Sequence, residues 1–370
     1  MTSERVLLVI NSLGTGGAER VLANLVAARK VAPEAEVHLA LLDDLTPMRT
    51  VAPLDGYHVL DGRGSLLRSA WQLRRLVGAL KPDVMVGFLI RSNCAIVLAS
   101  TGTPIRTIVC ERMHTASHLV NNHGVGIGLI AARSTIRWLY PRADRVLAVS
   151  DGVRGNLIEQ FRVLPSRVMT LPNPYDLAAI RAAGAQHPQR ELPDDYCICV
   201  SRLVAAKDVA TVLRSFAVER PTRDIVIVGE GPLHDSLRTL GHQLGIADHV
   251  HFTGFLANPY PVISRARFLV SASQNEGFPN AAAEAMALGV PVALTDCPSG
   301  PAELLVNGRY GLLIPLDNPA AFSSALRRMA DPAERAQFSA LGKERMEAFG
   351  LLPVARAYWN EFCSSQRAER

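Results

Sequence analysis

The chain has 370 residues, of which 48% are hydrophobic and 20% are charged, and its net charge is +5. These values are typical of a globular protein, so they exclude a disordered or collagen-like chain, and the length predicts two domains. The six cysteines are scattered and show no CxxC spacing, which favours a reducing compartment. The apolar run 6–10 is too short for a secretory h-region, so we expect a cytoplasmic location.

Short apolar runs alternate with helical patterns through the first half of the chain. The expected strands are 6–10, 37–42, 84–89, 105–110 and 146–149. This alternation predicts a parallel sheet with helices on both faces. We place this first lobe at residues 1–174, because the sequence Pro172-Asn173-Pro174 is a natural boundary.

A glycine-rich turn follows the first expected strand. Gly14, Gly16 and Gly17 precede a helical pattern that begins near Ala18. Such a turn lets backbone N–H groups approach an anion at the positive end of a helix. The turn is neither a complete dinucleotide fingerprint nor a P-loop, and a tight connection without a ligand is the alternative interpretation.

The positive charge is concentrated in the first lobe. Residues 1–175 carry 20 Lys and Arg against 13 Asp and Glu, a net charge of +7, whereas residues 176–370 carry −2. Two basic clusters contain aromatic residues: Arg68, Trp71, Arg74 and Arg75 on an expected helix over 66–80, and the segment Arg133–Arg145 with Trp138 and Tyr140. Such clusters predict a surface for anionic lipid headgroups, although a solvated helix face is the alternative. No nucleic-acid partner is expected, because no signature of a DNA- or RNA-binding module is present.

The stretch 113–132 has no Asp, Glu, Lys or Arg, but it contains three His, two Asn and three Gly. It is therefore too polar to be a membrane span. We expect it to be a mobile loop.

The second half of the chain repeats the alternation of the first. Its expected strands are 196–200, 225–228, 249–252, 268–271 and 291–294. We therefore predict a second lobe over 175–350, followed by a segment 351–370 whose helix packs back towards the first lobe. The predicted fold class is α/β, with two doubly wound, Rossmann-like lobes that face a cleft.

Charged residues stand at expected strand ends in the second lobe. Arg202 and Lys207 follow the strand 196–200, where they could clamp a diphosphate. Glu276 lies in a loop just before a helix that Pro279 and Gly289 delimit, and Glu284 lies within that helix. A second glycine turn, Gly229-Glu230-Gly231, follows the strand 225–228 and has the same two interpretations as the first.

These residues occur in motifs that resemble the retaining GT-B glycosyltransferases of family four. The motifs are Gly16-Gly17-Ala18-Glu19-Arg20, Ser201-Arg202-Leu203 with Lys207, Glu276-Gly277-Phe278-Pro279-Asn280 with Glu284-Ala285-Met286-Ala287, and Asn307-Gly308 with Gly311-Leu312-Leu313. The resemblance runs the length of the chain and is most specific in the second lobe.

The resemblance implies a role for each matching residue on the donor side. Arg202 and Lys207 hold the donor diphosphate, and Gly16 and Gly17 close on it from the first lobe. Glu276, with the amides of Gly277 and Phe278, faces the donor sugar. Glu284 binds the ribose, and the turn around Gly254 and Phe255 lines the nucleobase.

On the acceptor side, the resemblance covers Cys110-Glu111-Arg112-Met113-His114-Thr115. It implies that Glu111, Arg112, His114 and His118 contact the acceptor, with His114 as the catalytic histidine beside Glu276, Arg202 and Lys207. His118 and His123 are close enough in sequence to keep the choice of histidine open.

The resemblance implies retaining, metal-independent transfer of a hexosyl group from UDP- or GDP-hexose to an acceptor hydroxyl. The acceptor expected is a saccharide or lipid-linked saccharide at the cytoplasmic face of the membrane, in cell-surface polysaccharide or glycan assembly. No cofactor or metal is expected, since the chain has no Asp-x-Asp and no zinc-type spacing. The alternatives are a nucleotide-sugar epimerase or hydrolase on the same fold and a non-catalytic protein that binds sugar nucleotides or lipid surfaces.

Overall fold

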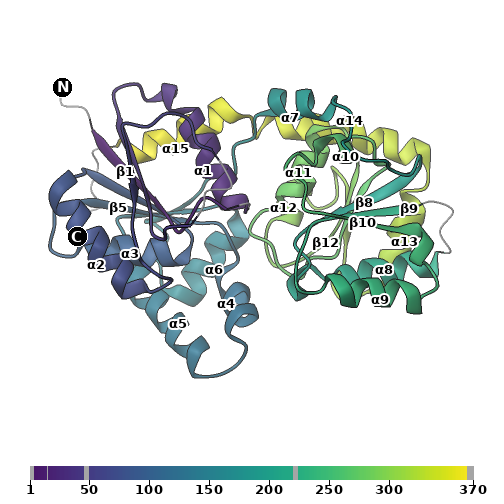
Figure 1. The fold of residues 1–370 in the computed structure, drawn as a ribbon, viewed down its shortest axis with the longest axis horizontal. Coiled ribbons are helices and arrows are strands. Elements are labelled where there is room, and N and C mark those ends of the chain that lie inside the picture. The colour runs from purple at the N-terminus through teal and green to yellow at the C-terminus, as the bar shows by residue number, and fades with distance from the viewer. Residues whose placement is uncertain (1–3, 15, 46–49, 220–223, 365–370) are drawn as a thin grey trace. The chain divides into compact units, whose positions relative to one another are not determined.

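The structure is a computed structural model that describes residues 4–364 except 15, 46–49 and 220–223. The chain divides into two compact units (Figure 1). Unit 1 contains residues 1–174 and 351–370, and unit 2 contains residues 175–350.

Unit 1 is built on a parallel sheet. Over the described residues, its seven strands are β1 Arg5–Ile10, β2 Glu36–Leu41, β3 Gly56–Val59, β4 Val84–Phe88, β5 Arg106–Glu111, β6 Arg145–Ala148 and β7 Val168–Thr170. They are ordered β3-β2-β1-β4-β5-β6-β7, so the chain reverses its winding direction between β1 and β4. Most strand residues are buried, as expected for a sheet with helices on both faces.

The helices of unit 1 include one from the end of the chain. They are α1 Gly17–Ala27, η1 Arg29–Val31, α2 Leu66–Leu80, α3 Ile90–Ser100, α4 Thr115–His123, α5 Ile127–Leu139, η2 Tyr140–Arg142, α6 Asp151–Phe161 and α15 Leu351–Phe362. Helix α15 lies against α1, where the indole of Trp359 donates a hydrogen bond to the carbonyl oxygen of Leu25 over 3.0 Å (Figure 1). Arg106 donates to the carbonyl oxygen of Glu361 over 2.6 Å, so two contacts attach the C-terminal part of α15 to the sheet and helices of unit 1.

Unit 2 repeats the architecture around its own core. Over the described residues its six parallel strands are β8 Tyr196–Val200, β9 Asp224–Val228, β10 Val250–Gly254, β11 Leu269–Ser271, β12 Val292–Thr295 and β13 Leu312–Ile314, in the order β10-β9-β8-β11-β12-β13. The helices are α7 Leu177–Gly184, η3 Ala205–Lys207, α8 Val209–Val218, α9 His234–Gln243, η4 Ala247–His249, α10 Tyr260–Ile263, α11 Asn280–Ala287, α12 Pro301–Leu305, α13 Pro319–Arg328 and α14 Pro332–Glu347. The winding direction reverses between β8 and β11.

The predicted fold class is confirmed, and the expected helix over 66–80 matches α2. The expected loop over 113–132 is wrong, because most of this segment forms α4 and the first turns of α5. Gly124 and Gly126 lie in the turn between the two helices, with φ of +60° and +145°, so these glycines mark a tight turn within a helical hairpin.

Candidate functional site

Charged side chains meet where the sheet of unit 2 changes its winding direction. Lys207 follows β8 and Glu276 follows β11, and these two strands are neighbours. The Lys207 ammonium forms an ion pair with a carboxylate oxygen of Glu276, and both side chains are partly buried. Ligands of doubly wound sheets bind at this position, beyond the carboxyl ends of the strands. The structure thus brings together two residues that were predicted from separate motifs.

The backbone around each member of this pair is held in place. Lys207 ends the short helix η3, and Asp208 then caps α8 by accepting a hydrogen bond from the Thr211 amide. On the other side, the hydroxyl of Ser299 donates to the carbonyl oxygen of Glu276. Gly300 adopts φ of +91°, and a Cβ there would approach the carbonyl oxygen of Gly277 to 3.1 Å. The loop after β12 therefore supports the Glu276 loop, a role that sequence reasoning missed although Pro298-Ser299-Gly300-Pro301 is a clear turn signal.

The second glycine turn packs against the segment that carries Arg202. A Cβ on Gly229 would lie 1.9 Å from the carbonyl oxygen of Ser201, and one on Gly231 would lie 2.4 Å from that of Leu203. The Leu203 amide also donates to the carbonyl oxygen of Glu230 over 2.9 Å. Close backbone packing alone thus explains why both positions are glycine. The side chain of Arg202 remains exposed.

Glu230, in the same turn, positions the segment expected to line the nucleobase. Its carboxylate accepts a hydrogen bond from the Phe255 amide over 3.1 Å. Gly254 has φ of +70° beside this carboxylate, and the Phe255 ring is exposed. An exposed ring next to an ordered turn is suited to stacking on a planar base. Sequence analysis did not identify Glu230, which acts through the backbone of a neighbouring loop.

Helix α11 carries the second carboxylate of the predicted pair. Glu284 is 2% exposed in the Ala-rich middle of the helix. Gly277 and Phe278 are also buried, and the Phe278 ring packs on Phe349 with 5.4 Å between ring centroids. Phe278 is therefore a core side chain, and only its backbone could contribute to a ligand site.

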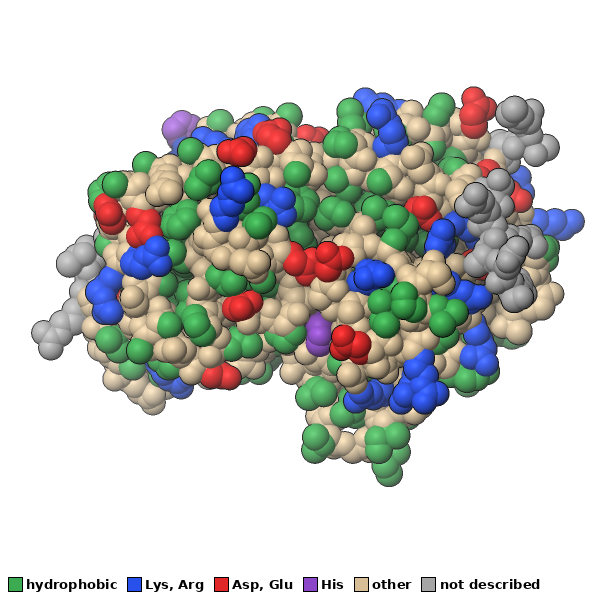
Figure 2. Space-filling model, turned by 180° about the vertical axis from the view of Figure 1, so that it is seen from behind, with side chains coloured by type: hydrophobic (Ala, Val, Ile, Leu, Met, Phe, Trp, Pro, Cys, Tyr) green, Lys and Arg blue, Asp and Glu red, His purple; other side chains and the backbone are tan. Residues whose placement is uncertain are grey.

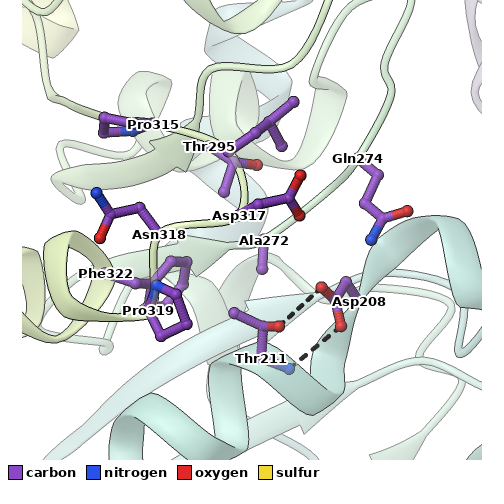
Figure 3. A pocket seen from close by; sticks show the side chains of 11 residues that line it. Asp208, Thr211, Ala272, Gln274, Thr295, Pro315, Asp317, Asn318, Pro319 and Phe322 are labelled. Atoms are coloured by element: carbon purple, nitrogen blue, oxygen red, sulfur yellow. Dashed lines mark hydrogen bonds between the residues drawn. The ribbon is translucent and has the colours of Figure 1, made fainter.

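A cavity of about 210 Å³ opens beside the Lys207–Glu276 pair, at the carboxyl ends of β11, β12 and β13 (Figure 3). Its lining includes Asp208, which adjoins Lys207, and Gln274, two residues before Glu276. Asp317 also lines it, and none of the predicted donor-binding residues does. Because two carboxylates and no cation line this cavity, it does not suit a diphosphate.

In unit 1, the first glycine turn follows β1 and begins α1. Gly16 is the N-terminal cap residue of α1, and Gly17 is its first residue. The Glu19 carboxylate lies against the turn, since a Cβ on Gly16 would approach its Oε2 to 2.4 Å. An anion that binds the start of α1 would therefore have to displace this carboxylate.

Glu111 and Arg112, predicted to contact the acceptor, are interior residues of unit 1. Glu111 is fully buried, and its carboxylate accepts hydrogen bonds from the Tyr140 hydroxyl over 2.7 Å and from the Arg112 amide over 3.0 Å. The guanidinium of Arg112 lies near the rings of Phe88 and Tyr358 and donates to the Tyr358 hydroxyl over 2.8 Å. Side chains with these partners and so little exposed surface favour a structural role, and an acceptor contact by either residue stays a prediction.

His114 directly precedes α4 and His118 lies on it, and both keep part of their surface exposed. His114 caps the helix, because its Nδ1 accepts a hydrogen bond from the Ser117 amide over 3.4 Å. The ring proton of neutral His114 is then on Nε2, and burial lowers the pKa of this ring. His118 accepts a hydrogen bond from the Asn122 amide group over 2.7 Å. His123 ends the helix and is exposed.

Several arginines of the predicted lipid-binding clusters have other partners. Arg74 donates to the carbonyl oxygens of Ala99 and Thr101 over 2.7 and 2.6 Å, which ties α2 to the end of α3. Arg68 pairs with Asp61 over 2.6 Å, and Arg145 with Glu361 over 3.6 Å. The two clusters are therefore less available to lipid than their sequences suggest.

Trp71 and Trp138 remain exposed, each with an arginine over its ring, Arg75 at 5.0 Å and Arg142 at 4.0 Å. In the described part of the chain, no helix is both long and apolar enough to cross a membrane. Nor do its His, Cys, Asp and Glu side chains form a group of three or more suited to a metal ion.

Each half of this sequence matches a family of known proteins. A family model described as "Glycosyltransferase Family 4" matches residues 15–179, and one described as "Glycosyl transferases group 1" matches residues 194–331. A Campylobacter jejuni relative, N-acetylgalactosamine-N,N'-diacetylbacillosaminyl-diphospho-undecaprenol 4-alpha-N-acetylgalactosaminyltransferase, is 30% identical over 95% of this chain and 98% of its own. A Mycobacterium tuberculosis relative, GDP-mannose-dependent alpha-(1-6)-phosphatidylinositol monomannoside mannosyltransferase, is 30% identical over 62% of this chain and 65% of its own.

Solved structures share the fold at low sequence identity. The Anabaena protein HepE in complex with UDP has a TM-score of 0.76 at 16% identity and covers 96% of this chain and 99% of its own. Sucrose-phosphate synthase from Thermosynechococcus elongatus has a TM-score of 0.78 at 18% identity, with coverages of 97% and 98%. Together with the full-length Campylobacter relative, these matches show that the chain has the GT-B fold and belongs to glycosyltransferase family 4, the group 1 glycosyltransferases.

Proposed function

We propose that this glycosyltransferase moves a hexosyl group from UDP- or GDP-hexose to a hydroxyl of a lipid-linked saccharide, with retention at the anomeric carbon. The observation that carries the proposal is the Lys207–Glu276 pair at the switch point of unit 2, with Arg202 on the same strand-end loop. The names of the two relatives above, which specify a diphospho-undecaprenol substrate and a phosphatidylinositol substrate, support a lipid-linked acceptor.

The charged side chains beyond the carboxyl ends of β8 and β11 suit a diphosphate leaving group. As the bond from sugar to phosphate breaks, negative charge grows on the leaving diphosphate, and donors fixed nearby stabilise the transition state more than the ground state. Arg202, Lys207 and the backbone amides around Gly277 supply such donors. The departing phosphate oxygen takes the proton of the acceptor hydroxyl, which attacks from the same face and so retains the configuration.

The ion pair has a consequence for donor binding. Before the donor binds, Glu276 neutralises Lys207. A diphosphate competes for the ammonium, and the released carboxylate can then accept hydrogen bonds from sugar hydroxyls. Glu284 is assigned to the ribose, so the two carboxylates do not act as the acid and nucleophile of a glycosidase.

His114 is the proposed catalytic residue on the acceptor side. Because Nδ1 is used by the helix cap and burial lowers the pKa, His114 is neutral near pH 7 and carries its proton on Nε2. It can therefore donate a hydrogen bond to the acceptor or to the sugar rather than remove a proton. His118 lies four residues further along α4, on the same side of the helix, and is the second proposed acceptor contact.

We propose that no metal or other cofactor takes part, because Arg202 and Lys207 supply the positive charge that a divalent ion supplies in other transferases. We also propose that the protein works at the cytoplasmic face of the membrane as a peripheral protein. The exposed Trp71 and Trp138 with their stacked arginines are the residues of the basic clusters that best support this placement.

The first test is a thermal-shift screen with UDP, GDP, ADP and their hexoses, with and without EDTA. A ligand at about 100 times its Kd stabilises the folded state by ~2.7 kcal/mol. A shift that is selective for the base and survives EDTA supports the donor site and metal independence. No shift with any nucleotide contradicts the donor assignment.

The second test measures transfer from the selected donor to a polyprenyl-diphosphate saccharide, with NMR assignment of the anomer formed. Retention supports the proposal, and inversion contradicts the same-face mechanism. Consumption of the donor without any acceptor indicates a hydrolase or epimerase. Donor binding without turnover on any acceptor indicates a binding protein.

A further inference from the structure

Helices α4 and α5 form a hairpin in unit 1 whose tip is apolar and exposed (Figure 1). Val125 is 93% exposed, Ile127 87% and Ile130 65%, and Val120 is exposed on the facing helix. Figure 2 shows hydrophobic side chains at the end of this projection, with Lys and Arg side chains behind them. We call Val120, Val125, Ile127 and Ile130 together the hairpin tip. Soluble surfaces seldom gather aliphatic side chains so exposed unless the patch meets a partner.

The charged side chains of the hairpin itself have one sign. The sequence contains no Asp or Glu from Arg112 to Ala143. Arg133 and Arg137 follow the tip along α5 and are exposed, as is Trp138. At a rise of about 1.5 Å per residue, Arg137 lies roughly 10 Å along the helix from Ile130.

This order of side chains matches the layers of a membrane surface. Apolar side chains at the end of the hairpin could enter the acyl boundary, which peripheral helices penetrate by roughly 5–10 Å. Arginine and tryptophan side chains one to two turns behind would then lie at the level of the headgroups, and the hairpin itself carries no carboxylate that anionic lipids would repel. A protein partner fits less well, because a standard interface takes about 20–30 residues a side and the convex tip offers four.

We propose that the hairpin tip is a wedge that inserts into an anionic lipid bilayer and anchors unit 1 to it. The hairpin tip adds an apolar part to the basic cluster 133–145, since apolar insertion and not charge alone holds the anchor in place. The wedge deepens the proposed function, on whose peripheral membrane placement it rests, but insertion itself needs neither donor nor acceptor. Failure of the wedge therefore leaves the transfer reaction untouched.

The test is flotation of the full-length protein with vesicles of phosphatidylcholine and phosphatidylglycerol, compared with vesicles of phosphatidylcholine alone. The variant V125S/I127Q/I130Q should bind the mixed vesicles at least about tenfold more weakly than the wild type. The matched control L164Q/V218Q replaces two aliphatic residues that are exposed elsewhere and should bind like the wild type. Because all five positions are exposed, the melting temperatures should stay close to that of the wild type.

Insertion is measured separately from adsorption. In an Ile130→Trp variant, lipids brominated on their acyl chains should quench the added fluorescence relative to the parent protein, and part of this quenching should persist at high salt. The proposal is overturned if the tip variant binds as tightly as the wild type, if the wild type does not float, or if Ile130→Trp is not quenched. It is also overturned if the tip substitutions convert a dimer to a monomer without changing flotation, because the tip would then pair with a second copy.

Discussion

Strand ends carry charged residues in both units, in different settings. In unit 2, Arg202, Lys207 and Glu276 follow β8 and β11 and keep part of their surface exposed. In unit 1, Glu111 ends β5 and Arg112 follows it, and both are buried among Tyr140, Tyr358 and Phe88. Parallel sheets thus place charged side chains at the carboxyl ends of their strands for two different purposes.

The difference lies in what covers each edge. In unit 1, the chain returns through α15, and Tyr358 of this helix binds Arg112 and the carbonyl oxygen of Leu171. At this covered edge, the charged residue Arg112 serves to attach the returning helix α15. In unit 2, the partners of Lys207 and Glu276 are one another, so the pair can exchange a protein contact for a ligand. A charged motif at a strand end therefore predicts a ligand site only where no later element covers it.

The largest expected effect is on catalysis at the exposed edge. Lys207→Ala removes a fixed cation from the leaving group, and loss of one such donor typically lowers kcat by ~100 to 1000-fold. Glu276→Gln should also abolish most transfer. Transfer assays at saturating donor measure both effects, and circular dichroism checks the fold.

Exposed residues of the same unit provide matched controls for these two variants. Arg214→Ala and Glu344→Gln change exposed charges on α8 and α14 and should retain wild-type activity. Near-wild-type transfer by Lys207→Ala or by Glu276→Gln would contradict the assignment of the donor site. The proposed difference between the exposed and the covered edge would then no longer hold.

The second prediction concerns the covered edge. Arg112→Ala removes a buried group that contacts two rings and two polar partners, and we expect a loss of about 3 kcal/mol in the free energy of unfolding of unit 1. All three tryptophans, Trp71, Trp138 and Trp359, belong to unit 1, so tryptophan fluorescence in urea follows this unit. Exposed Arg137→Ala should change stability by less than about 0.5 kcal/mol. If Arg112→Ala left stability intact and raised the acceptor KM, Arg112 would be an acceptor contact after all.

The third prediction tests the ribose assignment of Glu284. Glu284→Gln keeps the shape of the side chain but replaces a charged acceptor by a neutral one, which costs about 1.4 kcal/mol or tenfold in donor Kd. The wild type and the variant should bind a 2′,3′-dideoxy nucleoside diphosphate equally, because the hydroxyl partners are then absent. A tenfold difference that persists with the dideoxy ligand would mean that Glu284 acts on the structure of α11 and not on the ribose.

The elements that could be predicted from sequence are those whose burial is continuous. The strands β1 and β8 are almost wholly apolar, and α2 has a clear apolar stripe. The strands β3, β7 and β13 were not predicted, because none of them is a continuously buried run. β3 alternates between exposed and half-buried positions, and β7 and β13 each contain half-buried residues. The hairpin of α4 and α5 was expected to be a loop because its glycines obscured the helical pattern on either side.

The candidate site divides in the same way. Lys207 and Glu276 could be predicted because each lies in a motif next to a strand, and strand order then brings them together. The burial of Glu111 and Arg112 could not, since their partners Tyr140 and Tyr358 lie 29 and 246 residues away in sequence. The role of Glu230 was missed, although it lies in the second glycine turn, because it holds a loop in place that begins 25 residues further along the chain.

The smallest expected effect is the pH dependence of the covered edge. Burial raises the pKa of Glu111 above its ordinary value of 4.5, against the opposing effect of the hydrogen bonds it accepts. The folded state therefore binds this proton more tightly than the unfolded state. The resulting stabilisation is complete below pH 4.5 and is lost as the pH rises through the folded pKa, with a slope of at most about 1.4 kcal/mol per pH unit. Glu111→Gln removes this term, so the stability of the wild type relative to the variant should fall as the pH rises above 4.5 in urea titrations followed by tryptophan fluorescence, with the exposed Glu159→Gln as control. A relative stability that instead rises with pH below 4.5 and is constant above it would show that Glu111 is ionised in its buried site and is held there by its hydrogen-bond donors, so that even the covered edge keeps a charge.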